Sequence, residues 1–289
     1  MSADQTQAVT FEVRGKVAII TLNQEKKLNA MSQDLYYRIS QLLNEAAKRD
    51  DVYVTLLTAK GRFFSAYVSN HVLPSLSLTL FSGADVSISR STPESESDPN
   101  RHWLKTFVAN NLHVTRAFYT HPKILVTALN GPAVGLSAAL IAFSDFIYAA
   151  PHAYLLTPFS SLGLVAEGGA SRAFVQRLGI SKANEALIMS KRIPAEDLLQ
   201  AGFINKIIDT KGDSDKFRDA VLTEIDDRLG NHLVQDSLLK IKALIQKPER
   251  DFLDKQNVEE VFGGLERFNA GIPQEEFRKL ASGEKKHKL

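Results

Sequence analysis

The chain has 289 residues, 44% of them hydrophobic, so it can bury a large core in one large domain or in a domain with a smaller tail. Its 35 basic and 33 acidic residues leave a formal charge of +2, which gives no case for nucleic acid as a partner. The absence of cysteine excludes disulfides and thiolate chemistry. No apolar run approaches the ~18 residues of a membrane span, and the N-terminal residues lack a secretory pattern, so we expect an intracellular protein.

Strands alternate with helices from the N-terminus onward. Apolar alternation around a turn at 14–16 predicts a hairpin over residues 11–22, and apolar residues at helical spacing predict a helix over 32–48 with Ser32 as its cap. Strands are predicted over residues 52–58, 124–129, 146–150 and 153–156. A short apolar helix is predicted over 136–143. This order predicts an α/β fold with parallel strands joined by helical crossovers.

The C-terminal part is predicted to be helical. From residue 171 onward the sequence is mainly helical, and after about residue 213 it is a series of charged, amphipathic segments. We therefore expect a core over residues 1–212 and a helical subdomain with a tail over 213–289, which covers the active site or another subunit. The polar segment 87–100 contains two prolines and no periodicity, so it is predicted to be a mobile loop.

Two glycine-containing motifs could bind an oxyanion. In NGPAVGLSAAL, residues 130–140, a strand leads through Gly131 and Gly135 into a helix that begins near Leu136 and offers unpaired N–H groups. A tight strand-to-helix connection explains this motif equally well when it is taken alone. SGAD, residues 82–85, could present a second backbone N–H, and two donors from separate loops are what an oxyanion hole needs.

Glu167 is the candidate base. It lies in LGLVAEGGASR, residues 162–172, in a glycine-bounded turn before a helix. An acidic residue at that place also stabilises a helix without any catalytic role. Its apolar neighbours predict a partly desolvated carboxylate, a setting that raises a carboxyl pKa and improves a base. Ser137 lacks the G-x-S-x-G context of a serine hydrolase, and the seven histidines show no metal-ligand spacing.

The motifs VAIITLN, LNAMS, GRFFS, SGAD, NGPAVGLSAAL and LGLVAEGG, in this order, resemble the crotonase (enoyl-CoA hydratase/isomerase) family over about residues 11–210. Within it the chain is most similar to fungal peroxisomal isomerases that convert 3-enoyl-CoA to 2-enoyl-CoA. The resemblance implies a crotonase-like spiral of ββα units with a C-terminal helical subdomain. It also implies that the backbone N–H groups of Ala84 and Leu136 hold the thioester oxygen of an acyl-CoA while Glu167 moves a proton.

The resemblance implies further partners and contacts. The substrate would be bound through residues in three segments: Leu28, Asn29, Ala30, Ser82, Gly83, Ala84, Asp85, Val86, Gly135 and Leu136. No metal or redox cofactor is implied, because CoA is part of the substrate. A homotrimer or homohexamer is expected.

Hydratases of the family use two glutamates, and the matching positions here are Ala139 and Phe159. Because neither side chain can activate water or donate a proton, we expect an isomerase that forms 2-trans-enoyl-CoA in the β-oxidation of unsaturated fatty acids. A hydratase, a dienoyl-CoA isomerase and a catalytically silent CoA-binding or assembly subunit remain alternatives. A dienoyl-CoA isomerase needs a second acidic group, and the sequence shows none beside the EGG turn.

The C-terminal residues His287, Lys288 and Leu289 resemble a peroxisomal address of the S-K-L type, with His in place of Ser. A basic solvated tail is the alternative interpretation. The resemblance predicts import into the peroxisomal matrix by the receptor that reads such signals.

The relatives have FFS almost directly before SGAD, whereas here the 16 residues 66–81 lie between the two motifs. A displacement of Ala84 by about 1 Å could cost about 10²-fold in rate. The insertion has no charged residue and is rich in Ser and Leu. Our hypothesis is a translated retained intron or a gene-model error rather than an evolved loop, which sequencing of the mature transcript would test. If the insertion is real, a weakened or inactive family member is expected.

Overall fold

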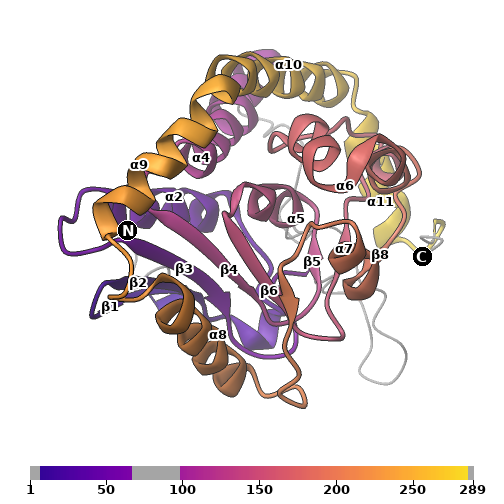
Figure 1. The fold of residues 1–289 in the computed structure, drawn as a ribbon. Coiled ribbons are helices and arrows are strands. Elements are labelled where there is room, and N and C mark those ends of the chain that lie inside the picture. Colours follow the sequence, from indigo (N-terminus) through magenta and orange to yellow (C-terminus); the bar gives the residue numbers. More distant parts are fainter. Residues whose placement is uncertain (1–6, 67–97, 286–289) are drawn as a thin grey trace.

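The computed structural model describes residues 7–66 and 98–285, which form two sheets covered by helices (Figure 1). The larger sheet has the order β1-β2-β3-β4-β6-β9, and the smaller has the order β5-β7-β8. The strands are β1 (Val9–Arg14), β2 (Val17–Leu22), β3 (Val54–Ala59), β4 (Ile124–Leu129), β5 (Ala133–Val134), β6 (Phe146–Ala149), β7 (Tyr154–Leu156), β8 (Ile193–Pro194) and β9 (Lys206–Ile207). In the larger sheet β1 is antiparallel to β2, and every other neighbouring pair is parallel.

Helices cover both faces of the larger sheet (Figure 1). The α-helices are α2 (Gln33–Ala47), α3 (Pro99–Trp103), α4 (Ala109–Tyr119), α5 (Leu136–Leu140), α6 (Ala170–Leu187), α7 (Ala195–Gln200), α8 (Ser214–Leu229), α9 (Gln235–Gln246), α10 (Arg250–Asn269) and α11 (Ile272–Ala281). Shorter turns of helix are η1 (Glu25–Lys27), η2 (Leu104–Val108), η3 (Ile141–Phe143), η4 (Ser160–Leu162) and η5 (Lys247–Glu249). Of these, η2 is a π-helical segment that joins α3 to α4.

The strands β2, β3, β4 and β6 are buried on both faces, which explains their nearly continuous apolar sequences. Along β2 and β3, neighbouring residues point to opposite sides: Ile20 and Leu57 join the core beneath α2, α4, α5 and α6, whereas Ile19 and Leu56 pack with α8. The predicted α/β class, with parallel strands and helical crossovers, is therefore confirmed.

Most predicted elements are present. The hairpin and the strand 124–129 form, and the helix α2 begins after Ser32, whose Oγ accepts the N–H of Leu35 at 3.3 Å. The predicted loop is wrong at its end, because α3 begins at Pro99 and the carboxylate of Asp98 caps it by accepting the N–H of Arg101 at 3.0 Å. The rest of that loop, over residues 87–97, lies outside the described residues. The two-residue strands β8 and β9 were not predicted.

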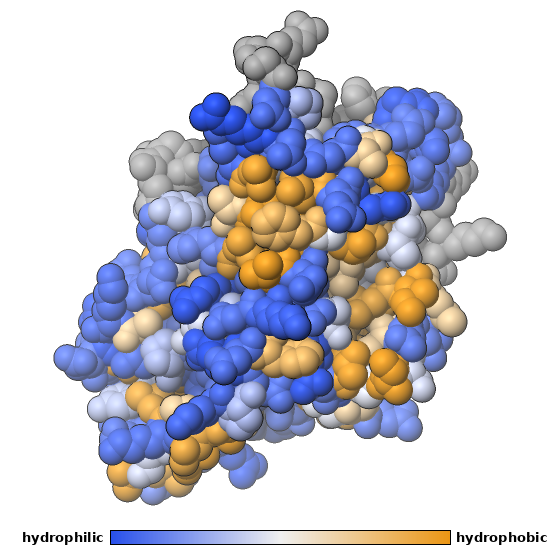
Figure 2. Space-filling view, turned by 90° about the horizontal axis from the view of Figure 1, so that it is seen from above, coloured by the Kyte–Doolittle hydropathy of each residue, from blue (hydrophilic) through white to orange (hydrophobic). Residues whose placement is uncertain are grey.

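The helices after residue 213 pack on the preceding part of the chain as well as on each other. Apolar residues of α8 cover one face of the sheet, and α10 packs against α3, η2, α4 and α6. Exposed apolar residues remain on the outer sides of α9 and α10, and Figure 2, a view from above, shows patches of hydrophobic side chains on this side of the molecule. Among the described helices, none is long and apolar enough to cross a membrane.

Candidate active site

Glu167 lies in a turn that packs directly against α5. The turn continues through Gly168 and Gly169, whose φ angles of +69° and +73° fall in the left-handed region that favours glycine. A Cβ atom on Gly168 would lie 2.7 Å from Cδ1 of Leu136 and 2.9 Å from Cβ of Ala139. The two glycines therefore let the turn approach α5, and the turn that carries Glu167 packs against the side chain of Leu136.

Asn111 contacts the side chain of Glu167. Its Nδ2 donates a hydrogen bond of 2.8 Å to Oε2 of Glu167 from the first turn of α4. Asn111 is 5% exposed, whereas Glu167 is half-buried. A buried amide requires a partner, so this bond both satisfies Asn111 and fixes the direction of the carboxylate.

The start of α5 has the geometry expected of a backbone donor. Gly135 precedes the helix with a φ of 66°, and its own N–H is bonded to the carbonyl of Leu156 at 2.8 Å. Leu136 is the first residue of α5, so its N–H has no carbonyl partner within the helix. The predicted oxyanion donor thus lies at a helix start beside the turn of Glu167.

The predicted CoA-binding segment 28–30 lies next to the strand that leads into α5. Leu28 and Asn29 have φ angles of 50° and 54°, and Nδ2 of Asn29 donates to the carbonyls of Lys60 and Phe63 at 2.9 and 2.8 Å. Ala30 is buried beside them. The carbonyl of Leu28 accepts the N–H of Ala66 at 2.9 Å, so the first residue of the insertion lies against this segment.

Hydroxyl groups link these segments. Oγ of Ser65 donates to the carbonyl of Asn29 at 3.0 Å and accepts from Oγ of Ser137, which in turn lies 2.8 Å from the hydroxyl of Tyr36. Ser137 thus contacts other hydroxyls in the core rather than a histidine. The remaining predicted contacts, Ser82 to Val86 including Ala84, lie outside the described residues, as do His287, Lys288 and Leu289.

The two positions at which hydratases of the family have glutamates are apolar core positions here. Ala139 is 0% exposed and lies against the glycine turn, while Phe159 is 1% exposed. Neither position supplies a group that could activate water.

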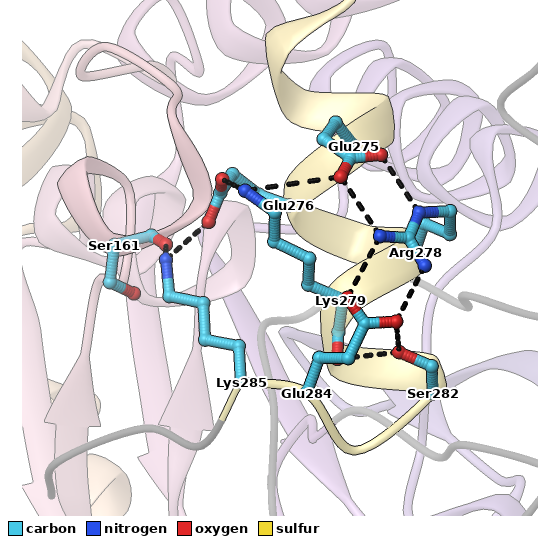
Figure 3. A network of polar contacts seen from close by, with 8 residues as sticks. All are labelled: Ser161, Glu275, Glu276, Arg278, Lys279, Ser282, Glu284 and Lys285. Atoms are coloured by element: carbon cyan, nitrogen blue, oxygen red, sulfur yellow. Dashed lines mark hydrogen bonds and ion pairs between the residues drawn. The ribbon is translucent and has the colours of Figure 1, made fainter.

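The C-terminal helices hold the segment before Glu167. Lys285 donates from Nζ to the carbonyl of Ser161 and to Oε2 of Glu276, each at 2.5 Å, within the polar network that Figure 3 shows at the end of α11. Nε of Arg267, on α10, donates to the carbonyl of Gly163 at 2.8 Å. The base is therefore presented by a segment that α10 and α11 fix from one side.

The helix that carries Asn111 is also attached to α10. The hydroxyl of Tyr119 donates to Oδ1 of Asp254 at 2.5 Å. Burial, together with this hydrogen bond, raises the pKa of Tyr119 to about 12, so its phenol stays neutral near pH 7. Sequence reasoning missed Asn111, although Val108, Asn111, Thr115 and Phe118 fall on one helical face and an asparagine among apolar positions is a signal of a buried partner.

Residues 96–271 match the family model described as enoyl-CoA hydratase/isomerase. The chain is 58% identical over 291 residues to a Delta(3,5)-Delta(2,4)-dienoyl-CoA isomerase of Pyricularia oryzae, covering 97% of this chain and 98% of the relative. It is 33% identical to the 3,2-trans-enoyl-CoA isomerase of Saccharomyces cerevisiae, with coverage of 99% and 98%. A mouse relative, enoyl-CoA delta isomerase 3, peroxisomal, is 30% identical, with coverage of 90% and 72%.

Among solved structures, an enoyl-CoA hydratase from Bacillus halodurans matches with a TM-score of 0.76 and 18% identity, over 94% of this chain and 99% of that one. This likeness shows the fold, and it confirms the crotonase-like architecture that the motifs predicted. The family model and the relatives carry the assignment further, because they match most of the chain in sequence. The chain belongs to the enoyl-CoA hydratase/isomerase (crotonase) family, among its enoyl-CoA isomerases.

Proposed function

We propose that the protein converts 3-enoyl-CoA to 2-trans-enoyl-CoA in the β-oxidation of unsaturated fatty acids, with Glu167 as the single proton carrier. The observation that carries the proposal is the contact of the Glu167 turn with Leu136 and Ala139 of α5, together with the bond from Asn111. A carboxylate held by Asn111, in a turn that packs on the first residue of α5, supports the proposal that the base and one oxyanion donor act on the same substrate.

The chemistry follows from where charge develops. Glu167 takes a proton from C2 of the substrate, and the electrons move onto the thioester oxygen and C4. Backbone donors stabilise that oxygen, and loss of one such donor typically costs roughly 2.7–4 kcal/mol. Leu136 is proposed as one donor and Ala84 as the other. The protonated Glu167 then returns the proton at C4, so the double bond moves without water, metal or redox cofactor.

A dienoyl-CoA isomerase is the second candidate, because the relative from Pyricularia oryzae that carries this name is 58% identical. That reaction moves a proton along a longer conjugated system and was expected to need a second acidic group. The apolar side chains at Ala139 and Phe159 count against hydration, so the two isomerase reactions are separated by their substrates.

One experiment separates these functions. Purified wild-type protein and the Glu167→Gln variant are incubated separately with 3-hexenoyl-CoA, 2-hexenoyl-CoA and 3,5-octadienoyl-CoA, and the products are identified by chromatography and NMR. The proposal predicts turnover of 3-hexenoyl-CoA that falls by about 10³-fold in the variant, within the range attributed to a general base. Glu259→Gln, an exposed change of the same kind on α10, should leave the rate unchanged.

Each alternative has its own result. Faster turnover of the dienoyl substrate than of 3-hexenoyl-CoA would replace the proposal with the second candidate. Hydration of 2-hexenoyl-CoA would favour a hydratase, and wild-type protein that turns over none of the three substrates would indicate a silent CoA-binding subunit.

We also propose that the protein works in the peroxisomal matrix, delivered by the import receptor that reads the C-terminal His287, Lys288 and Leu289. The mouse relative with peroxisomal in its name supports this proposal. A fluorescent protein fused to the N-terminus should co-localise with a peroxisomal marker, and removal of the last three residues should abolish the co-localisation.

A further inference from the structure

Glu260 is a buried carboxylate that contacts the turn after Glu167. It lies on α10 and is 6% exposed. Its Oε2 accepts the N–H of Gly169 at 2.6 Å, and its Oε1 accepts the N–H and the hydroxyl of Ser171 at 2.9 and 2.5 Å. One side chain from a distant part of the sequence thus satisfies three donors at the start of α6.

These donors require a partner from outside their own segment. Gly169 is the N-cap residue of α6, a position at which Ser, Thr, Asp or Asn usually supplies the capping oxygen. Here its φ is +73°, and a Cβ atom would lie 2.5 Å from Cζ of Phe143. A local side chain is therefore excluded at this position, and the cap comes from α10.

The same contacts restrain the backbone that carries the base. Gly168 and Gly169 have the widest conformational choice of any residue type, and Glu167 directly precedes them. Bonds from Glu260 fix the N–H of Gly169, two residues from the base. On α10, Asn257 also donates to the carbonyl of Leu112 at 3.3 Å, next to Asn111. One helix thus holds both the turn of Glu167 and the helix of its amide partner.

The surroundings of the Glu260 carboxyl act on its charge in opposite directions. Burial raises the pKa of the Glu260 carboxyl, although the hydrogen bonds from Ser171 and Gly169 lower it. The net direction shows that the charged form is disfavoured by its surroundings. The carboxylate is held by three donors, so it ties the turn after Glu167 to α10.

We propose that Glu260 is a positioning residue for the reaction: it fixes the Gly168–Gly169 turn and thereby holds Glu167 in the geometry that proton transfer needs. The inference rests on the proposed function of Glu167. It assigns to α10 a part in the chemical step, in addition to its part in the core.

The test compares Glu260→Gln with Glu259→Gln, its exposed neighbour on the same helix. Both variants are assayed with 3-hexenoyl-CoA, and the binding of the saturated analogue hexanoyl-CoA and the melting temperature are measured. Because a misplacement of about 1 Å can cost about 10²-fold, we expect kcat of Glu260→Gln to fall by about 10- to 100-fold. Its KM and its affinity for hexanoyl-CoA should change by less than about 3-fold, as expected when an interaction acts only in the transition state. Glu259→Gln should match the wild type.

A double variant shows whether Glu260 acts through Glu167. If it does, Glu260→Gln should cause no further loss in the Glu167→Gln background, since the base it positions is already absent. A further loss of the same size there would overturn the inference, as would equal kcat values for Glu260→Gln and Glu259→Gln in an active enzyme. Wild-type protein without isomerase activity would instead contradict the proposed function itself.

If Glu260→Gln does not fold, Ser171→Ala supplies the test, because it removes one donor and keeps the carboxylate. The expected result is a fall in kcat of about 3-fold with KM unchanged, in keeping with the smaller effect of one hydrogen bond among several. Unchanged kcat in that variant would contradict the inference.

Discussion

At Glu167 the chemistry depends on the direction of one half-buried carboxylate. Asn111 sets that direction through a neutral N–H donor at 2.8 Å, which stabilises the ionised form without adding a charge. The choice of an amide matters because a carboxylate in its place would repel the base. Sequence patterns singled out Glu167 through its glycine turn. For Asn111 the sequence shows only an asparagine on an apolar helical face, and its partner is defined by the packing of α4 against that turn.

The variant Asn111→Asp should therefore move the pH dependence of the reaction. Two carboxylates within hydrogen-bonding distance disfavour each other's charged form, and Glu167 must be charged to act as a base. We expect the acid limb of the kcat profile to shift to higher pH by about one unit or more, so that the variant loses activity at a higher pH than the wild type does. Asn100→Asp on α3 is the control, since Asn100 accepts from Asn269 through an oxygen that Asp retains. An unchanged acid limb in Asn111→Asp would contradict this role of Asn111.

At the scale of elements, the sequence predicted those strands and helices that are determined by interactions within their own segment. The strand β4 was predicted with the bounds that it has, because Ile124–Leu129 is an unbroken apolar run buried on both faces. The strands β8 and β9 have two residues each and form through pairing with β7 and β6. They are too short to show a periodicity in the sequence. Asp98 and Pro99 carried a helix-start signal that the polar composition of the preceding loop obscured.

The contacts of Glu260 could not be predicted from the sequence for the same reason, because they depend on tertiary packing. Glu260 falls on the buried stripe of α10 with Val261, Gly264 and Phe268, so helical periodicity alone would have placed a carboxylate in the core. Its partners, Gly169 and Ser171, are fixed by the tertiary packing of α10 on α6, which the sequence does not contain.

His121 should make the contact between α4 and the sheet sensitive to acid. It is 1% exposed, its Nε2 lies 2.8 Å from Oγ1 of Thr55, and burial with the nearby Lys242 and Lys123 lowers its pKa to about 3. The folded state therefore holds a neutral ring, while the unfolded chain takes up a proton near pH 6.5. Its stability contribution is present above that pH and is lost as the pH falls toward 3.

We expect this group alone to lower the free energy of unfolding by about 2 kcal/mol between pH 7.5 and pH 5, since one pKa unit corresponds to about 1.4 kcal/mol. His121→Gln, which keeps a polar group beside Thr55, should reduce the measured pH dependence by about that amount in urea denaturation. The exposed His232→Gln should leave it unchanged. Equal pH dependence in His121→Gln and the wild type would show that the buried ring does not titrate as described.

At the scale of the whole molecule, α10 has two sides with different roles. Its inner side contacts the turn of Glu167 and the helix of Asn111, while apolar residues remain exposed on its outer side and on α9. The exposed apolar residues of the two helices are Ile241, Leu244, Ile245, Phe252, Val258 and Phe262. Leu244 and Ile245 are 71% and 70% exposed. Contiguous exposed apolar surface commonly marks a contact with another protein.

The resemblance to crotonases implies a homotrimer or homohexamer, and we propose that this outer face takes part in that contact between copies of the chain. Leu244→Glu should then lower the mass measured by light scattering from that of three or six 32.0 kDa chains toward that of one, because burial of a new charge in an apolar contact is unfavourable. Lys255→Glu, an exposed change of charge on α10, should leave the mass unchanged. A wild-type protein that elutes with the mass of one chain would contradict the assembly, and an oligomer unaffected by Leu244→Glu would place the contact on another face. Since the inner side of α10 contacts the turn of Glu167, dissociation should also lower kcat.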